Sequence, residues 1–210
     1  MNTGAVRGQG LSGAYAQTFA NGYPLFAWNL PLFQGFDAQG FSSYADGGNQ
    51  LYHSALPTFN AGLTNNFNYK NWNLSVFLNT SRGFYVYNNT ANTLFIKGSL
   101  KTAHNVIKEV ASSKENPINS NAVSSRFVEK GDFIRLSNLT LSYQFTLKNS
   151  FIKTMTANVS GQNLALWTKY SGLDPEINTD AKISGVPSRG FDFHSYPKAK
   201  TVTLGLNIGF

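Results

Sequence analysis

The sequence predicts an all-β fold, an antiparallel transmembrane β-barrel segment of about seven strands with short periplasmic turns and long extracellular loops. Three observations lead to this prediction. Charged residues make up only 13% of the 210 residues, aromatic residues make up 14%, and the mean hydropathy of −0.23 shows that uncharged polar residues fill the difference. Several stretches alternate apolar and polar residues over about 9–11 positions, enough to cross a bilayer. The connections between these stretches alternate between short and long.

The first two expected strands are the weaker ones, near residues 11–19 and 25–33, and the turn ANGYP joins them. The preceding stretch GQGLSG, residues 8–13, has the glycine spacing of a dinucleotide-binding loop. That loop must follow a buried strand, and MNTGAVR is too short and too polar to be one. Gly22 and Pro24 would also end any helix after it within roughly three turns. We therefore assign these glycines to a strand whose neighbours pack closely.

The clearest hairpin is predicted for residues 59–80. Apolar residues occupy alternate positions in FNAGLTNNFNY and WNLSVFLNT, and Lys70 and Asn71 separate the two runs as a two-residue turn. Tyr69 and Trp72 flank that turn, where aromatic side chains suit a membrane interface. An aromatic cross-strand pair in a soluble hairpin has the same pattern, so that alternative stays open.

Three more strands are predicted towards the end of the chain, in LTLSYQFTL (139–147), MTANVSGQNLALW (155–167) and TVTLGLNIGF (201–210). The alternation slips near Gly161, which predicts a β-bulge. Long connections are expected over about residues 37–56, 82–131 and 168–198. The middle connection is expected to hold a short helix, LKTAHNVIKEV (100–110), with Leu100, Ala103, Ile107 and Val110 on one side.

No arrangement of residues in the sequence predicts catalysis, a metal site or a cofactor. No pair among the three histidines has the spacing of zinc ligands, and DPEINTD (174–180) lacks the regular acid spacing of a calcium loop. The net charge is +7, but the lysines and arginines are scattered rather than clustered as in a nucleic-acid-binding surface. We therefore predict a protein that is not an enzyme, has no metal or other cofactor, and binds no nucleic acid.

The chain shows no apolar run near the ~20 residues of a membrane helix. Its first residues, MNTG, have neither the basic start nor the apolar stretch of a signal peptide. Taken alone, this predicts a cytoplasmic protein or a piece of a longer one.

Several segments resemble, in order and spacing, the end of the SusC/RagA-type TonB-dependent outer-membrane transporters. They are LPTFNAGLTNNFNYKNWNLSVFLNTSRG, FVEKGDFIRLSNLTLSYQF, VSGQNLALWTKYSGLDPEI and YPKAKTVTLGLNIGF. GLSGAYAQTFANGYPLF is similar to the region just before them. The resemblance covers nearly the whole chain, so residues 1–210 are expected to be the C-terminal part of such a transporter's β-barrel domain, without plug domain and signal peptide.

The resemblance implies a plugged barrel of about 22 strands in the outer membrane of a Gram-negative bacterium. It implies import of oligosaccharides or peptides, driven by the TonB complex and usually assisted by a SusD-like surface lipoprotein. The family's TonB contacts lie outside this chain. The last strand also resembles the signal read by the barrel-assembly machinery, through Thr203, Gly205, Ile208 and Phe210, with Ile208 a departure from the family pattern.

Aromatic residues in the long loops are candidates for stacking on sugar rings or contacting peptide side chains: Tyr85, Tyr87, Trp167, Tyr170, Phe191 and Phe193. For any single one of them, packing between loops or a place at the upper membrane interface is the simpler explanation. The alternative for the whole chain is a soluble β-sandwich that binds carbohydrate. It would explain the aromatic residues, but neither the sorting of loops by length nor the last strand.

Overall fold

The chain divides into two compact units, each formed by several segments. The computed structural model describes residues 1–8, 11, 13–94, 96–102, 106, 108–148, 151–179 and 181–210. The strand unit comprises Phe59–Arg82, Asp132–Lys169 and Pro197–Phe210. The loop unit comprises Met1–Thr58, Gly83–Gly131 and Tyr170–Tyr196. Both units are built mainly from antiparallel sheet, which confirms the predicted all-β fold.

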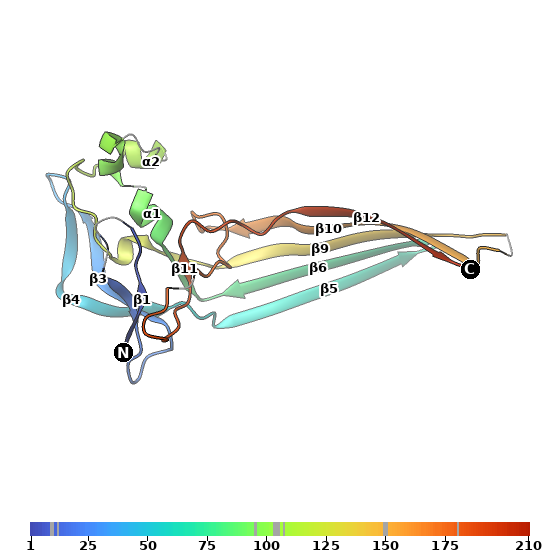
Figure 1. Cartoon of the computed structure of the whole chain (residues 1–210), viewed down its shortest axis with the longest axis horizontal. Helices are drawn as coiled ribbons and strands as arrows, with labels where there is room; N and C mark the ends of the chain where they lie inside the picture. Colours follow the sequence, from blue (N-terminus) through green and yellow to red (C-terminus); the bar gives the residue numbers. More distant parts are fainter. Residues whose placement is uncertain are drawn as a thin grey trace. The chain divides into compact units, whose positions relative to one another are not determined.

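The strand unit is one five-stranded antiparallel sheet, in which the strands lie side by side (Figure 1). Its order is β12-β10-β9-β6-β5. The strands are β5 (Phe59–Tyr69), β6 (Trp72–Arg82), β9 (Phe133–Phe145), β10 (Thr154–Thr168) and β12 (Thr201–Gly209). These correspond to the five strands with the strongest alternation in the sequence, although β9 begins six residues before the predicted strand.

Two local details of this sheet confirm sequence predictions. Tyr69 pairs with Trp72 across the β5–β6 turn, and Lys70 adopts a positive φ of 52° within it. In β10 the register with β9 shifts between Gln162 and Ala165, so the predicted slip is a β-bulge just after Gly161. Asn163 lies inside the bulge with a φ of 52°.

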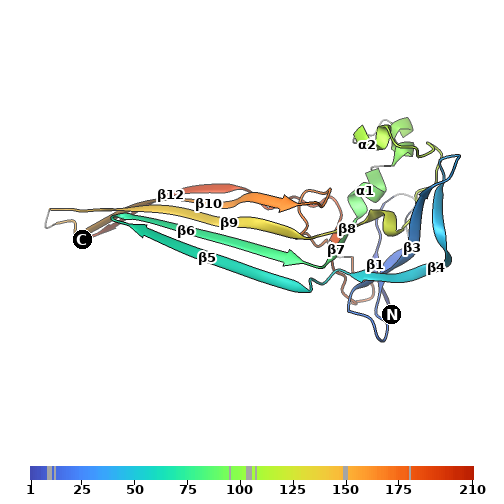
Figure 2. The ribbon, with the colours of Figure 1, turned by 180° about the vertical axis from the view of Figure 1, so that it is seen from behind.

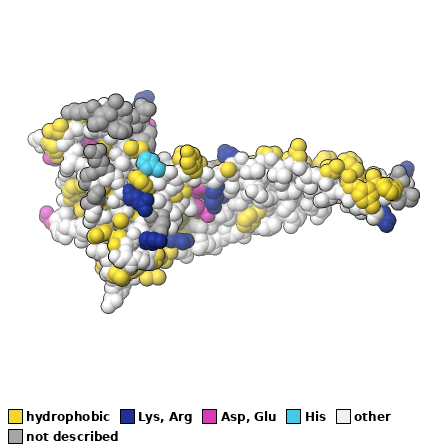
Figure 3. Space-filling view, viewed as in Figure 1, with side chains coloured by type: hydrophobic (Ala, Val, Ile, Leu, Met, Phe, Trp, Pro, Cys, Tyr) yellow, Lys and Arg dark blue, Asp and Glu magenta, His cyan; other side chains and the backbone are white. Residues whose placement is uncertain are grey.

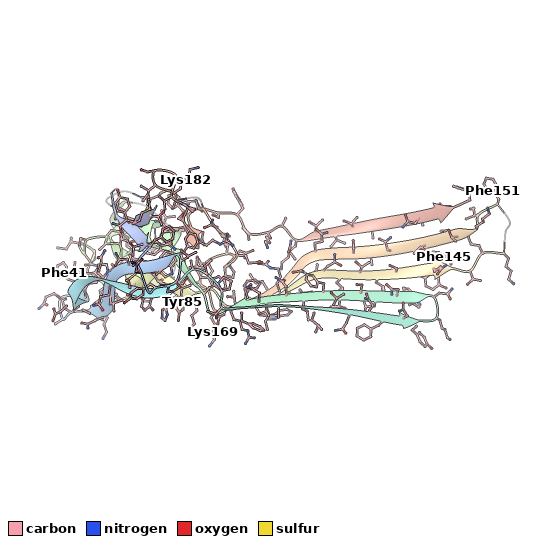
Figure 4. The ribbon with its side chains drawn as sticks, turned by 90° about the horizontal axis from the view of Figure 1, so that it is seen from below. Phe41, Tyr85, Phe145, Phe151, Lys169 and Lys182 are labelled. Atoms are coloured by element: carbon pink, nitrogen blue, oxygen red, sulfur yellow. The ribbon has the colours of Figure 1, made fainter. Side chains whose placement is uncertain are left out.

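The register sorts the side chains of this sheet onto two chemically different faces. One row across three strands is apolar: Leu141, Val159 and Leu204. The adjacent row, on the opposite face, is polar and uncharged: Thr140, Ser160 and Thr203. Figure 4 shows side chains standing off the strands, with Phe145 and Phe151 labelled at the turn end of the sheet.

The apolar face of the sheet remains accessible. Leu204 is 81% exposed and Phe67 is 58% exposed, and every residue of β5 is exposed. A sheet in water buries its apolar face against another layer, and the strand unit contains only this one layer. An exposed, continuous apolar face is typical of strands that meet lipid.

The loop unit contains two further sheets (Figure 2). The four-stranded antiparallel sheet has the order β1-β2-β3-β4, with β1 (Asn2–Ala5), β2 (Tyr15–Thr18), β3 (Ala27–Phe36) and β4 (Ser42–Ser54). The three-stranded sheet has the order β11-β7-β8, with β11 (Phe191–Asp192), β7 (Tyr85–Asn88) and β8 (Val128–Lys130). The short β11 runs parallel to β7, whereas the other pairs are antiparallel.

The two weaker strands predicted near residues 11–19 and 25–33 need a correction. They correspond to β2 and β3, which pair with each other in the loop unit and not with the strand unit. Residues 37–56, expected to be a long loop, contain β4. The physical reason is burial, because Trp28 and Leu30 of β3 are wholly inaccessible and supply the core of the loop unit.

Three aromatic rings from distant parts of the sequence form the centre of that core. Trp28 and Phe191 meet edge to face with ring centroids 5.2 Å apart, and Tyr87 lies 5.9 Å from Trp28 and 5.7 Å from Phe191. All three side chains are at most 1% exposed. Other buried apolar residues belong to the same cluster: Val6, Leu11, Leu30, Ala55, Phe127 and Val128.

Short helices complete the loop unit: α1 (Asn89–Leu94), η1 (Lys97–Thr102), α2 (Lys108–Ala111) and η2 (Ser125–Phe127). The helix predicted over 100–110 is represented by the end of η1 and the start of α2, while Ala103 and Ile107 lie outside the described residues. Helix α1 was not predicted because NTANTL has no apolar repeat; the side-chain oxygen of Asn88 caps it by accepting a 2.9 Å bond from the N–H of Ala91. None of the helices in the described ranges is long and apolar enough to cross a membrane.

Candidate functional site

A pocket of about 540 Å³ opens in the loop unit. Three segments line it: Thr90 of α1, the turn Ser171–Leu173, and the stretch from Asp192 of β11 through His194, Ser195 and Tyr196. The lining combines hydroxyl groups, one carboxylate, one imidazole and an aromatic ring. Its volume falls in the range of about 300–1,000 Å³ that is usual for small-molecule sites.

Thr90 holds one wall of the pocket in place. Its hydroxyl group donates to the carbonyl oxygen of Asp192 at 3.2 Å and accepts from the N–H of His194 at 2.8 Å. The chain turns sharply there, since His194 has a φ of 51°. The parallel pairing of Asp192 with Asn88 anchors the start of the same segment.

Gly172 allows the turn to approach the carboxylate. A Cβ atom at this position would lie 2.7 Å from Oδ2 of Asp192 and even closer to the ring of Tyr170. Any side chain at residue 172 would therefore displace the carboxylate or the ring that supports it. A glycine here keeps the pocket open beside Asp192.

Asp192 is the charged group of the site. It is only 4% exposed, and its Oδ2 accepts a 2.7 Å hydrogen bond from the Tyr170 hydroxyl group. Burial raises the pKa of the Asp192 carboxyl group, and the negative charges of Glu129 and Asp174 raise this pKa further. Hydrogen bonds from the Tyr170 hydroxyl group and the Ser195 N–H lower the pKa but do not cancel the rise. Burial and the neighbouring Asp192 charge likewise raise the pKa of Tyr170, which therefore stays protonated and donates.

A second carboxylate, Glu129 of β8, fixes the turn at Ser171, which lines the pocket. Its Oε2 accepts from the N–H of Ser171 at 2.8 Å, and its Oε1 accepts from the Ser171 hydroxyl group at 2.7 Å. The side-chain amide of Asn88 donates to the same Oε1 at 3.1 Å. In the described part of the chain, no group of three or more histidine, cysteine or acidic residues is arranged to hold a metal ion.

The structure places the six predicted loop aromatics in different surroundings. Tyr170 is buried against Asp192 and supports the pocket, and the half-buried Phe193 follows that aspartate in sequence. Tyr87 and Phe191 belong to the core with Trp28. Tyr85 stacks on His53, with ring centroids 3.9 Å apart and planes nearly parallel.

Trp167, the sixth, lies in the strand unit. It pairs with Ile134 of β9 on the apolar face and is 56% exposed. An exposed aromatic residue on the apolar face would suit a membrane interface, which is the alternative considered from the sequence. A role in substrate binding stays a prediction for all six aromatic residues.

Sequence reasoning missed most of the pocket lining. Thr90, Ser171 and Asp192 are isolated in sequence and belong to no motif. The run FDFHSY, residues 191–196, was the available signal, because it combines a carboxylate with aromatic residues in a loop. This run lines a pocket only because Thr90 of α1 bonds it and because Glu129 of β8 holds the turn at Ser171 beside it.

The four residues of the predicted barrel-assembly signal lie in or just after β12. Thr203 and Gly205 pair with Ser160 and Asn158 on the polar face, while Ile208 pairs with Met155 on the apolar face. Phe210 follows the strand, and its ring centroid lies 5.4 Å from that of Phe151. Recognition of these residues by the assembly machinery stays a prediction.

Comparison with characterised proteins identifies relatives by sequence. No family model matches the chain. TonB-dependent receptor P3 of Formosa agariphila is 32% identical over 85% of this chain and 19% of its own length. TonB-dependent receptor SusC of Bacteroides thetaiotaomicron is 29% identical over 83% of this chain and 17% of its own length. The chain therefore spans about a fifth of the length of the curated relatives it matches.

Solved structures share the fold. The RagAB peptide importer in its closed-closed state matches 93% of this chain and 24% of its own chain, with a TM-score of 0.75 and 18% identity. A second structure, of the RagAB peptide transporter, matches 92% of this chain and 24% of its own, with a TM-score of 0.71 and 18% identity.

Proposed function

We propose that this chain, which has the sequence and fold of a SusC/RagA-type TonB-dependent receptor, forms part of an outer-membrane importer of oligosaccharides or peptides in a Gram-negative bacterium. The strand unit would be a section of the barrel wall, and the loop unit would be built from its extracellular connections. Residues 1–210 would then be the C-terminal part of the barrel domain. The chain itself would perform no covalent chemistry.

The strongest support is the accessible apolar face of the strand unit. Leu63 lies on β5 and Leu206 on β12, the two edge strands of the sheet, and these side chains are 54% and 56% exposed. Their pairing partners on the neighbouring strands are also apolar. In water this area would cost roughly 25 cal/mol for each Å² left uncovered. In a bilayer, lipid chains would cover the apolar face, and the polar face would contact a water-filled lumen.

Aromatic side chains at the turn end of the sheet add support. Tyr69 and Trp72 flank the β5–β6 turn, and the ring of Trp72 lies 4.7 Å from that of Tyr143. Figure 3 displays hydrophobic side chains gathered at this end, beside the C-terminus. Such a concentration is expected where strands leave the hydrocarbon region.

The sorting of connections supports the same topology. β5 and β6 meet at a two-residue turn, and short turns at one end of the strands are usual in outer-membrane barrels. The chain enters the strand unit at Phe59, Asp132 and Pro197 and leaves it at Arg82 and Lys169. The strand register places these connections at the other end of the strands from the β5–β6 turn. A soluble β-sandwich that binds carbohydrate has no reason for this sorting, so we do not favour that alternative.

The partners proposed for the intact receptor are a SusD-like lipoprotein at the surface, the TonB complex through regions outside this chain, and the barrel-assembly machinery. RagAB, which shares this fold, is described as a peptide importer, and SusC shares sequence with this chain. Those names support an imported nutrient as the cargo. Whether the cargo is a glycan or a peptide would be determined by the loop residues of this chain.

Fractionation of cells that express the intact receptor tests the proposal. An antibody to residues 197–210 should detect the protein in the outer-membrane fraction, resistant to carbonate extraction and released by detergent. Deleting the gene should abolish uptake of at least one oligosaccharide or peptide, and restoring it should recover that uptake. A detergent-independent, soluble protein would contradict the barrel assignment and favour the β-sandwich.

A further inference from the structure

We propose that the pocket beside Asp192 binds a primary ammonium group of the transported cargo. This deepens the proposed function, and it rests on that function only in taking the ligand to be cargo. Two sources carry such a group: a peptide, through its terminal amine or a lysine side chain, and an amino sugar. The shared chemistry is a small cation with three hydrogen-bond donors.

The first argument is a buried negative charge at the pocket that lacks a cation. Asp192 is bonded by the Tyr170 hydroxyl group and the Ser195 N–H, both uncharged donors. Glu129 is bonded by Ser171 and Asn88, which are also uncharged. Over the described ranges, neither carboxylate forms an ion pair with a lysine, an arginine or His194. A buried charge left without an opposite charge is costly, and a cationic ligand would remove that cost.

The second argument is that the pocket can complete the coordination of an ammonium group. Besides Asp192, the hydroxyl-bearing residues Ser171 and Ser195 line the same space. The hydroxyl groups of Ser195 and Thr179 lie 2.8 Å apart, which orients Ser195 within the wall. One charged acceptor and two hydroxyl acceptors match the three N–H bonds of a primary ammonium.

The third argument concerns the carbon skeleton that would carry the ammonium. Tyr196, which is 94% exposed, and Leu173, which is 66% exposed, line the pocket together with the buried carboxylate. An exposed aromatic ring attracts cations and packs against an aliphatic stem or the face of a sugar. Most of the surface of these two side chains is therefore free to contact a ligand.

Other ligands fit the pocket less well. A neutral glycan would leave the charge of Asp192 uncompensated. A metal ion would need more acidic or histidine ligands than the described residues bring together. An anionic ligand would be repelled by Asp192 and by its neighbours Glu129 and Asp174.

The test uses the intact receptor in detergent and isothermal titration calorimetry. The probes are Nα-acetyl-lysine amide, with one ammonium group, and its Nε-acetylated form, with none; glucosamine and glucose form a second matched pair. We expect each charged probe that binds to bind at least tenfold more tightly than its neutral partner. Binding of the lysine probe alone would identify a peptide as the source, and binding of glucosamine alone an amino sugar.

Variants separate the pocket from general charge effects. Asp192→Asn should weaken the charged probe at least tenfold, and Tyr196→Ala, at an exposed position that leaves the fold intact, should weaken it severalfold. Asp46→Asn removes the same charge from an exposed position on β4 and should change nothing. Equal binding of charged and neutral probes, no binding of any probe, or unchanged binding in both pocket variants would overturn the proposal. Loss of the outer-membrane location with probe binding intact would instead overturn the proposed function.

Discussion

Arg126 and Glu115 form a two-point ion pair inside the loop unit. Nη1 of Arg126 lies 2.7 Å from Oε1 of Glu115, and Nη2 lies 2.9 Å from Oε2. The side-chain amide of Asn119 and the N–H of Lys97 donate to the same carboxylate at 2.9 and 3.1 Å. The guanidinium group also lies over the ring of Phe36, 4.9 Å from its centroid. The pair therefore fastens the helical connection to β3.

Replacing Glu115 with Gln should loosen this connection. The Glu115 side chain is 2% exposed, and removing one partner of a buried pair leaves the other uncompensated, at a cost of roughly 3 kcal/mol. Amide hydrogen exchange of residues 115–127 in the intact receptor should accelerate accordingly. Glu109→Gln, at an exposed position of α2, is the matched control and should leave exchange unchanged. Equal acceleration in both variants would contradict the structural role of the pair.

The same pair should make the loop unit sensitive to acid. Burial alone would raise the pKa of Glu115, but hydrogen bonds from Arg126 and Asn119 and the charge of Arg126 hold that pKa below its ordinary value. The stabilisation of the loop unit by ionised Glu115 is therefore complete above the ordinary glutamate pKa of about 4.3. It is lost as the pH falls through the lowered pKa of Glu115 in the folded protein. Exchange measured from pH 6 downwards should show this loss in the wild type and not in Glu115→Gln.

Asp192 should have the opposite pH dependence. Its pKa is raised by burial, so its contribution to stability is complete below an ordinary pKa of about 3.9 and is lost as the pH rises through the raised value. Asp192→Asn should remove this loss. The measurement is the thermal unfolding of the loop unit, followed by near-ultraviolet circular dichroism, at a series of pH values. A variant that loses as much stability as the wild type on raising the pH would show that another group titrates.

Substitutions of Phe191 and Tyr196 should affect the stability of the loop unit very differently, because one side chain packs in the core and the other faces solvent. Phe191→Ala removes a buried ring that packs against both Trp28 and Tyr87 and should destabilise the loop unit by about 3–5 kcal/mol. Tyr196→Ala should leave stability within about 0.5 kcal/mol, because the side chain is 94% exposed. Protease resistance of the loop unit in the intact receptor measures both effects. Comparable stability of the two variants would mean that the Trp28 core tolerates the loss of its third ring.

The two faces of β12 should respond differently to a new charge. Leu204→Arg places a cation on the apolar face and should cost roughly 2–4 kcal/mol if it lies near the bilayer midplane. Asn207→Arg places the same side chain on the polar face, where Asn207 pairs with Thr156, and should be tolerated. The folded fraction in outer membranes, measured by heat-modified migration on gels, reports the difference. Equal losses would argue against a lipid-facing row through Leu204.

The strand unit was predictable because its periodicity has a physical cause that acts on every residue. A strand with lipid on one side and water on the other must alternate, so β5 was located from Phe59 to Tyr69 by pattern alone. In the loop unit, Trp28 and Leu30 are buried by a core assembled from distant segments. Burial by distant segments produces no regular alternation of apolar and polar residues along the strand. β2 and β3 were therefore assigned to the barrel wall and not to the four-stranded sheet of the loop unit.

The pocket was less predictable than the strands for a similar reason. Asp192 and Ser171 are ordinary loop residues in the sequence, and they gain significance from Tyr170, Thr90 and Glu129, which the fold brings to them. Two of the predicted aromatic residues lie beside pocket residues, since Tyr170 donates to Asp192 and Phe193 follows that aspartate in sequence. Aromatic content could not separate rings that fill the core from rings that face solvent, because both are aromatic residues in irregular segments.

The packing of Phe191 against both Trp28 and Tyr87 has a consequence for the order of folding. These rings are supplied by β3, β7 and β11, so the core of the loop unit cannot close until residue 191 has been synthesised. Contacts of such long sequence separation form slowly. A polypeptide that ends before residue 191 would lack one of the two rings that pack against Trp28, and would leave apolar surface of this core uncovered.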